Sequence, residues 1–155
     1  MPWDWPVVVN NLEASAFCTW KSSKSNQYLR LPTEGEYEAM ASTLIPNSKV
    51  HLRMESYASE MPANSFEHSS VGLCDVVGHL WQHLWTLFYP FEGFKIHPYY
   101  EDYSTPAFDG KHDMMRGGSW INQGAFGEKT SRNYFRRHFY QFSGFRYVLS
   151  DNPAP

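Results

Sequence analysis

Residues 29–38 read LRLPTEGEYE, and this stretch predicts both the end of a strand and the start of a helix. The run from Tyr28 to Leu31 predicts a short strand, which ends at Pro32 because proline cannot donate to a strand ladder. Thr33, followed three residues later by Glu36, forms a capping box, and this pattern predicts the start of a helix. We expect this helix to be short and to bury one face, formed by Tyr37, Met40 and Leu44.

A second capping pattern lies upstream of this stretch. Val7–Val9 is a β-branched run that predicts a strand, and Asn10 then stands three residues before Glu13. A helix over residues 11–21 is therefore expected. The residues that should form its buried face, by helical spacing, are Leu12, Ala16, Phe17 and Trp20.

Downstream, signals for regular structure become sparse. Residues 46–70 show weak periodicity and predict loops, and the prolines and glycines of residues 88–118 argue against long helices. Residues 116–120, RGGSW, predict a close backbone turn because paired glycines permit positive φ. Residues 145–149 alternate well enough for a closing strand, and residues 151–155 form a tail.

The composition predicts one globular domain over residues 1–150. The chain has 155 residues, of which 42% are hydrophobic and 19% charged, and its formal net charge is −3. An acidic balance argues against a dedicated nucleic-acid binder, and no apolar run is long enough to span a membrane. With two cysteines, no disulfide scaffold and no secretory signal pattern at the start, a reduced, cytoplasmic protein is expected.

Aromatic residues make up 17% of the chain. They favour a loop-rich fold in which large flat side chains pin an irregular backbone. The alternative is that some of them are stacking platforms for a small ligand.

Three groups of residues could carry chemistry, each with a structural alternative. His79 and His83, spaced by four, would share one face of a helix and could bind a metal with a third histidine such as His97 or His112. Their apolar flanks favour core positions instead. A basic cluster interleaved with aromatic residues near the end of the chain is similar to a nucleic-acid patch, which the negative net charge opposes. Its members could equally bind substrate carboxylates through bidentate contacts or brace loops, and they are Arg132, Arg136, Arg137 and His138. Neither Cys18 nor Cys74 lies in a nucleophile motif.

Five segments in order resemble the sulfatase-modifying-factor, or formylglycine-generating-enzyme, domain. They are residues 6–18, the stretch 29–38 (close to the family's RLPTEAEWE), residues 78–83 (GHLWQH, where the family reads GNVWEW), residues 116–120 and residues 143–146. The resemblance implies an α+β, C-type-lectin-like fold with short helices and small antiparallel sheets. Formylglycine generators carry a reactive cysteine shortly after the GGSW turn, and this chain has none there, so that activity is not expected.

Residues 72–148 more narrowly resemble the central domain of 5-histidylcysteine sulfoxide synthases, the enzymes that make the first intermediate of ovothiol. The similar segments are residues 89–106, 108–110 and 135–139, together with the variant Trp81-Gln82-His83. In that family, iron(II) activates O2 and cysteine sulfur is coupled to the histidine imidazole as a sulfoxide. The resemblance places the iron ligands on an upstream DinB-like helical domain, so we expect no metal ligand and no cofactor in this chain alone.

The same resemblance implies roles for particular residues. A tyrosine near the iron would come from the His-Pro-Tyr-Tyr loop, so Tyr99 and Tyr100 are the catalytic candidates, with a packed loop position as the alternative for either. The substrates cysteine and histidine would contact residues that match the family's pattern: Gln82, His83, Arg136, Arg137 and Arg146. The chain would then be the substrate-shaping module of such an enzyme, inactive without its iron-bearing partner domain. A stand-alone lectin-like module that binds a small ligand is the alternative.

Overall fold

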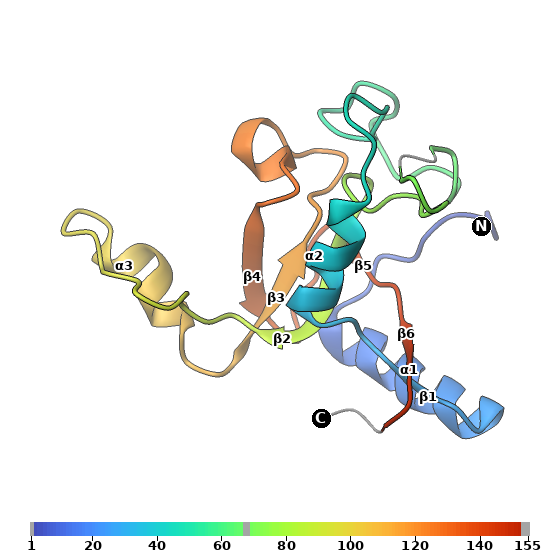
Figure 1. Cartoon of the computed structure of the whole chain (residues 1–155), viewed down its shortest axis with the longest axis horizontal. Coiled ribbons are helices and arrows are strands. Elements are labelled where there is room, and N and C mark those ends of the chain that lie inside the picture. Colours follow the sequence, from blue (N-terminus) through green and yellow to red (C-terminus); the bar gives the residue numbers. More distant parts are fainter. Residues whose placement is uncertain (1, 67–68, 153–155) are drawn as a thin grey trace.

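A mixed sheet of four strands lies at the centre of the computed structural model, which describes residues 2–66 and 69–152 (Figure 1). In spatial order its strands are β4 (Arg132–Arg136), β3 (His112–Arg116), β2 (Trp81–Leu87) and β5 (Ser143–Gly144). The first three pair antiparallel, whereas β5 runs parallel to β2. This parallel pair differs from the expected antiparallel sheets. It arises because residues 137–142 carry the chain from one edge of the sheet to the other without reversing the direction of the next strand.

Helix α1 (Asn11–Ser25) and a small two-stranded sheet form the second layer of the structure (Figure 1). In that sheet β1 (Tyr28–Arg30) pairs antiparallel with β6 (Val148–Ser150). The predicted helix and its Asn10 capping box are confirmed. The predicted buried face is wrong, because Leu12 and Trp20 are half exposed and the buried apolar residues are Ala14 and Cys18, which pack on Leu31.

The N-terminal strand prediction is also wrong. Val7–Val9 has no strand partner over its length, although the Val9 amide donates to the Ser143 carbonyl at 3.0 Å. The segment runs beside β5, where a Cβ at Gly144 would be 2.9 Å from the Val7 carbonyl oxygen, but it forms no regular ladder.

Helix α2 (Glu34–Ser42) begins at the predicted capping box and covers the central sheet. The Thr33 hydroxyl accepts from the Glu36 amide, and the Glu36 carboxylate accepts from the Thr33 amide at 2.7 Å. Tyr37 is fully buried, as expected, and packs with residues from the sheet and its flanking loops: Ala41, Val76, Leu84, Phe88, Ala107 and Met114. Met40 and Leu44 pack against this cluster from its edge.

A buried ion network joins α2 to the two strands beneath it. The Glu34 carboxylate accepts from Arg116 Nη1 on β3 at 2.5 Å and from Arg132 Nε on β4 at 2.8 Å. The Arg116 guanidinium also lies over the Tyr37 ring, 4.7 Å from its centroid, and donates to Glu38. The motif that opens α2 and the arginine of the Gly-Gly turn therefore meet inside the protein.

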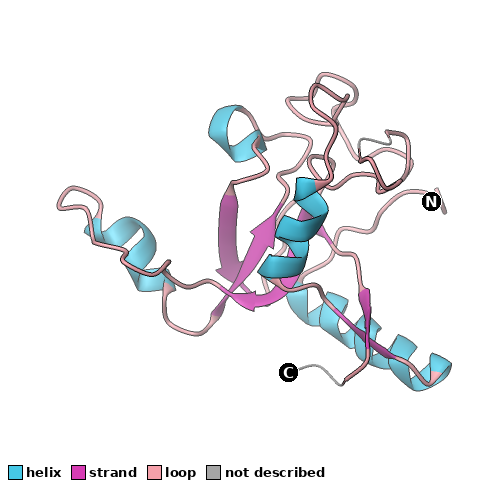
Figure 2. Cartoon of the chain, in the orientation of Figure 1, coloured by secondary structure: helices cyan, strands magenta, loops and turns pink. Residues whose placement is uncertain are grey.

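Loops connect these elements over much of the chain (Figure 2). Apart from bridges at Leu44–Ser69 and His51–Gly78, residues 46–66 and 69–70 form loops as predicted, whereas residues 67–68 lie outside the described residues. Residues 88–118 hold only the four-residue α3 (Glu101–Ser104) and the 3-10 turn η1 (Thr105–Ala107) besides β3; a second turn, η2 (Gly124–Gly127), follows. The closing strand begins at Val148, and residues 153–155 of the expected tail are not described. No described helix is long and apolar enough to cross a membrane.

Glu36 is expected to stabilise the fold above pH 4.5 and to lose that effect as the pH falls. Its carboxylate accepts two hydrogen bonds from Arg30, at 2.7 and 2.8 Å, and these lower its pKa from 4.5 to about 2. Because the folded pKa lies below the unfolded one, the stabilisation is present above the unfolded pKa. The side chain is 39% exposed, so solvent screening reduces the stabilisation that the ion pair provides. E36Q should therefore cost about 1 to 2 kcal/mol of unfolding free energy at pH 7.

The measurement is urea unfolding of both proteins between pH 7 and pH 2.5. The difference in unfolding free energy should be constant above pH 5 and shrink toward pH 2.5. Glu13 offers a matched control, since it fills the same capping position on α1 but pairs with the Tyr140 hydroxyl instead of an arginine. A difference that stays constant over the whole pH range would show that the Arg30 contact does not hold the carboxylate ionised.

Candidate functional site

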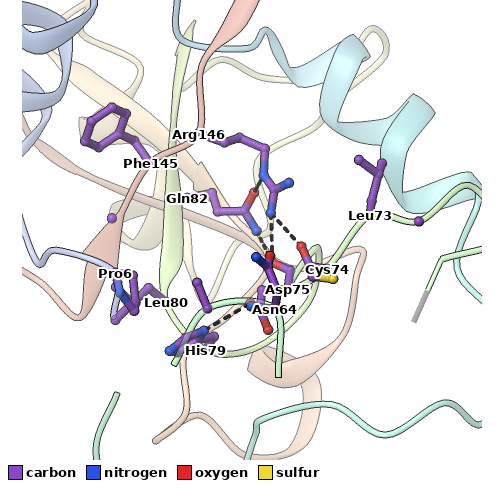
Figure 3. A pocket seen from close by; sticks show the side chains of 13 residues that line it. Pro6, Asn64, Leu73, Cys74, Asp75, His79, Leu80, Gln82, Phe145 and Arg146 are labelled. Atoms are coloured by element: carbon purple, nitrogen blue, oxygen red, sulfur yellow. Dashed lines mark hydrogen bonds and ion pairs between the residues drawn. The ribbon is translucent and has the colours of Figure 1, made fainter. Parts of the chain in front are cut away.

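Gln82 and Arg146 form a hydrogen-bonded pair at the side of the central sheet (Figure 3). Gln82, on β2, donates from Nε2 to the carbonyls of Asp75 and Val76 and accepts from Arg146 Nε at 2.6 Å. Arg146 in turn donates from Nη2 to the carbonyls of Cys74 and Asp75, at 3.0 and 3.2 Å. The structure therefore brings together two of the predicted substrate-binding residues, and main-chain carbonyls hold both in place.

This pair lines a cavity of about 340 Å³. The cavity lies between the segment 72–75, the start of β2 and the strand-end residues 144–146, and Figure 3 shows its side chains. Burial lowers the pKa of the Arg146 guanidinium, and the nearby Asp75 charge opposes that effect. Sequence reasoning missed Asp75 and Asn64 at this cavity, because they come from loops with no motif of their own.

His79 and His83 do not lie on a helix, as their spacing of four residues would need for a metal site. His83 is on β2, which begins at Trp81, and His79 lies in the bend before that strand. His83 lies in the core, and its Nε2 is 3.0 Å from the Val9 carbonyl, so Nε2 must carry the hydrogen. Burial lowers the pKa of His83. His79 Nε2 accepts from the Met61 amide at 3.1 Å, and its Nδ1 lies 3.4 Å from Asp75 Oδ2.

The other two histidines of the metal hypothesis are also engaged locally. His97 Nδ1 accepts from the Tyr99 amide, and His112 Nδ1 lies 2.9 Å from Asp109 Oδ1. Within residues 2–66 and 69–152, no group of three histidine, cysteine or acidic side chains could hold a metal ion.

The segment that contains α3 extends away from the sheet as an arm (Figure 1), and Tyr99 and Tyr100 directly precede that helix. We call residues 89–108 the aromatic arm. The two tyrosines are 87% and 66% exposed, and the His97 ring lies 5.7 and 5.4 Å from their ring centroids. The arm is anchored at its base, where Tyr134 of β4 stacks on Phe88 and donates to the Tyr103 carbonyl.

Arg136 and Arg137 lie at the end of β4, beside the base of this arm. Arg136 pairs in register with His112, four residues after the arm ends. Arg137 forms an ion pair with Asp113 at 3.0 Å; burial raises the pKa of this aspartate, and Arg137 opposes the rise. Both arginines line a second cavity of about 330 Å³ with Gly110, Lys111 and His138. The five predicted substrate-binding residues thus fall in three places: the Gln82–Arg146 cavity, the Arg136–Arg137 cavity and, for His83, the core.

A third cavity, of about 220 Å³, lies against the Gly-Gly turn and is lined by several amide and hydroxyl side chains: Ser119, Asn122, Asn133 and Gln141. The turn itself was predicted from RGGSW, but these polar residues were not. They come from the turn, β4 and the loop before β5, so no spacing along the sequence could have grouped them.

The comparisons with known proteins agree on the fold. The chain resembles PvdO from Pseudomonas aeruginosa with a TM-score of 0.70 at 17% identity, over 94% of this chain and 62% of that one. It resembles Treponema denticola variable protein 1 with a TM-score of 0.71 at 20% identity, over 93% of this chain and 70% of that one. These likenesses confirm the predicted α+β, sulfatase-modifying-factor fold.

The relatives found by sequence similarity belong to a narrower group of proteins than the solved structures. Hercynine oxygenase of Mycobacterium tuberculosis is 29% identical, over 94% of this chain and 37% of that protein. Ergothioneine biosynthesis protein 1 of Schizosaccharomyces pombe is 28% identical, over 93% of this chain and 18% of that protein. The chain therefore spans well under half the length of the curated relatives that it matches. A family model described as the sulfatase-modifying factor enzyme 1-like domain matches residues 2–151, and this chain belongs to that family.

Proposed function

We propose that this chain is the substrate-shaping module of an ovothiol-type sulfoxide synthase, which joins cysteine sulfur to the histidine imidazole with O2. In this reaction a C–S bond forms, and the S–H and imidazole C–H hydrogens leave. One oxygen atom goes to sulfur and the other leaves in water. The relation to hercynine oxygenase and ergothioneine biosynthesis protein 1 over nearly the whole chain supports this class of reaction.

The observation that carries the proposal is the aromatic arm. Large apolar and aromatic side chains stand exposed along it, namely Tyr89, Phe91, Phe94, Ile96, Tyr99, Tyr100 and Tyr103. Exposed apolar surface gathered on one projecting segment marks an interaction site rather than the scattered exposure of an ordinary surface. We assign this arm to the interface with a DinB-like helical domain, in the same chain or a separate one, and Tyr99 or Tyr100 to the catalytic centre formed there.

The residues described in this chain do not fit an iron site. No group of three suitable donors exists among them, and His79 and His83 are engaged by the Met61 amide and the Val9 carbonyl. The iron(II) that would activate O2 is therefore assigned to the partner domain. This chain contributes a tyrosine hydroxyl that can hold or transfer a proton, and arginines at the base of the arm.

Of the predicted carboxylate-binding groups, Arg136 and Arg137 suit the proposed interface best. They line one cavity beside the arm, where Arg137 is paired with Asp113 and the Arg136 guanidinium can bind a carboxylate through two hydrogen bonds. Arg146 and Gln82 lie in a different cavity, and His83 is buried, so we do not propose a substrate contact for His83.

The test reconstitutes the reaction from two proteins. The chain is incubated anaerobically with iron(II), its bound metal is measured by elemental analysis, and cysteine, histidine and O2 are then added with and without an iron-loaded DinB-like domain. We expect the sulfoxide, detected by mass spectrometry, only when both proteins are present. One iron per chain in the absence of the helical domain would move the metal centre onto this chain.

The tyrosine assignment has its own variants. Y99F or Y100F is expected to lower sulfoxide formation by roughly 100-fold in the reconstituted system, the loss typical of a removed proton-transfer group. Y28F removes the hydroxyl of a half-exposed tyrosine on β1, outside the arm, and should leave the rate unchanged. Wild-type rates in both arm variants would contradict the proposed role.

A further inference from the structure

We propose that the cavity lined by Gln82 and Arg146 binds a free α-amino acid with an apolar side chain, as its zwitterion. The cavity shares no lining residue with the aromatic arm or the Arg136–Arg137 cavity, so this inference stands apart from the proposed function. It rests on two opposite charges and an apolar wall around one space of about 340 Å³, which lies within the range of small-molecule sites.

The positive charge is held rigidly at the cavity wall. Three hydrogen bonds fix the Arg146 guanidinium, and all three acceptors are neutral: the Gln82 amide oxygen and the carbonyls of Cys74 and Asp75. These bonds use Nε and Nη2. Nη1 donates no hydrogen bond to any residue that the structure describes, and Figure 3 shows it without a contact to the residues drawn. A fixed guanidinium nitrogen with its hydrogens unused is suited to a ligand carboxylate.

The negative charge comes from Asp75. Its side chain is turned toward Asn64 and His79, with Oδ2 accepting from the Asn64 amide at 3.2 Å and 3.4 Å from His79 Nδ1. Arg146 contacts the Asp75 main-chain carbonyl and not its carboxylate, and both residues line the same cavity. A carboxylate has about four acceptor positions, so it can also accept from a ligand ammonium group.

The two charges together select the ligand class. A simple anion would be attracted by Arg146 but repelled by Asp75. A simple protonated amine would be attracted by Asp75 but repelled by Arg146. A zwitterion satisfies both, because its carboxylate and ammonium are carried by one carbon. The lining also includes the apolar residues Pro6, Leu73, Leu80 and Phe145, which suit an aliphatic side chain.

The experiment titrates the whole chain with L-leucine and follows the amide and arginine side-chain signals by ¹⁵N NMR. The proposal expects saturable shifts at Gly72, Gly144 and the Arg146 Nε–H. Three analogues each remove one charge or both: leucinamide lacks the carboxylate, N-acetyl-leucine the ammonium, and isobutylacetamide both. Each should bind roughly 10-fold or more weakly than leucine, because a charged hydrogen bond is lost.

Equal binding of leucine and N-acetyl-leucine would show a carboxylate site and overturn the zwitterion proposal. Equal binding of all four compounds would show an apolar cleft, and the absence of saturable shifts with leucine would overturn the site itself. R146Q and D75N should each weaken leucine binding roughly 10-fold or more. R53Q makes the same change of charge outside the cavity, at a half-exposed side chain paired with Glu55, and should leave binding unchanged. If R146Q does not fold, the analogue series on the wild-type chain still decides the matter.

Discussion

The E34Q variant is expected to lose about 3 to 5 kcal/mol of unfolding free energy, or roughly 10 °C in melting temperature. Glu34 is the shared acceptor of Arg116 and Arg132, and Arg116 is almost completely buried. Glutamine keeps the shape of the side chain but removes its negative charge. It also presents an NH2 group where a guanidinium donates, so two arginines lose their common buried counter-charge.

Glu38 provides the matched control. It pairs with the same arginine, but its side chain is 54% exposed, so E38Q should cost at most about 1 kcal/mol. Urea unfolding of the three proteins at pH 7 measures both differences. If E34Q and E38Q cost the same, the network between α2 and the sheet would not depend on the buried charge.

The G78A variant is expected to lose about 2 to 4 kcal/mol of unfolding free energy. Gly78 has φ +82°, and a Cβ there would stand 2.6 Å from the His51 carbonyl oxygen. The His51 carbonyl accepts from the His79 amide, and the Gly78 amide donates to the Gly117 carbonyl. Neither the backbone at His51 nor the backbone at Gly78 can therefore move aside without breaking a hydrogen bond. Backbone conformation and close approach therefore both oppose alanine.

Gly35 is the control for this substitution. It lies in the first turn of α2, and a Cβ there would meet nothing within 4 Å. G35A should stabilise the protein by about 0.5 to 1 kcal/mol, because alanine has the better helix propensity. Thermal unfolding of both variants gives the comparison. A G78A protein as stable as wild type would mean that this turn relaxes without cost.

The elements that sequence reasoning located correctly are those whose signals are local. Both capping boxes bring together atoms three residues apart, so their side chains fix the starts of α1 and α2 whatever surrounds them. The buried face of α1 was not predicted correctly. Its amphipathic pattern is weak, and the packing of Leu31 and Phe145 selects Ala14 and Cys18 over the larger Leu12 and Trp20.

The candidate site shows the same division. Tyr99 and Tyr100 could be proposed from the sequence because they lie in one continuous segment that resembles a known family. Asp75 was not found, because its relation to Arg146 joins positions 71 residues apart. Likewise, the four-residue spacing of His79 and His83 predicts a shared face only on a helix, whereas His83 is on β2 and His79 lies in the bend before it.

The sequence by itself determined the helix starts, the Gly-Gly turn, the family and the absence of a cysteine after that turn. Each of these depends on residue types within a few positions of one another. Tertiary structure alone decided that Glu34 holds Arg116 and Arg132, that Arg146 and Asp75 face one cavity, and that the aromatic arm stands exposed. The physical reason is that ion pairs and cavities depend on distances across the fold. Chain topology sets those distances, and residue spacing does not encode them.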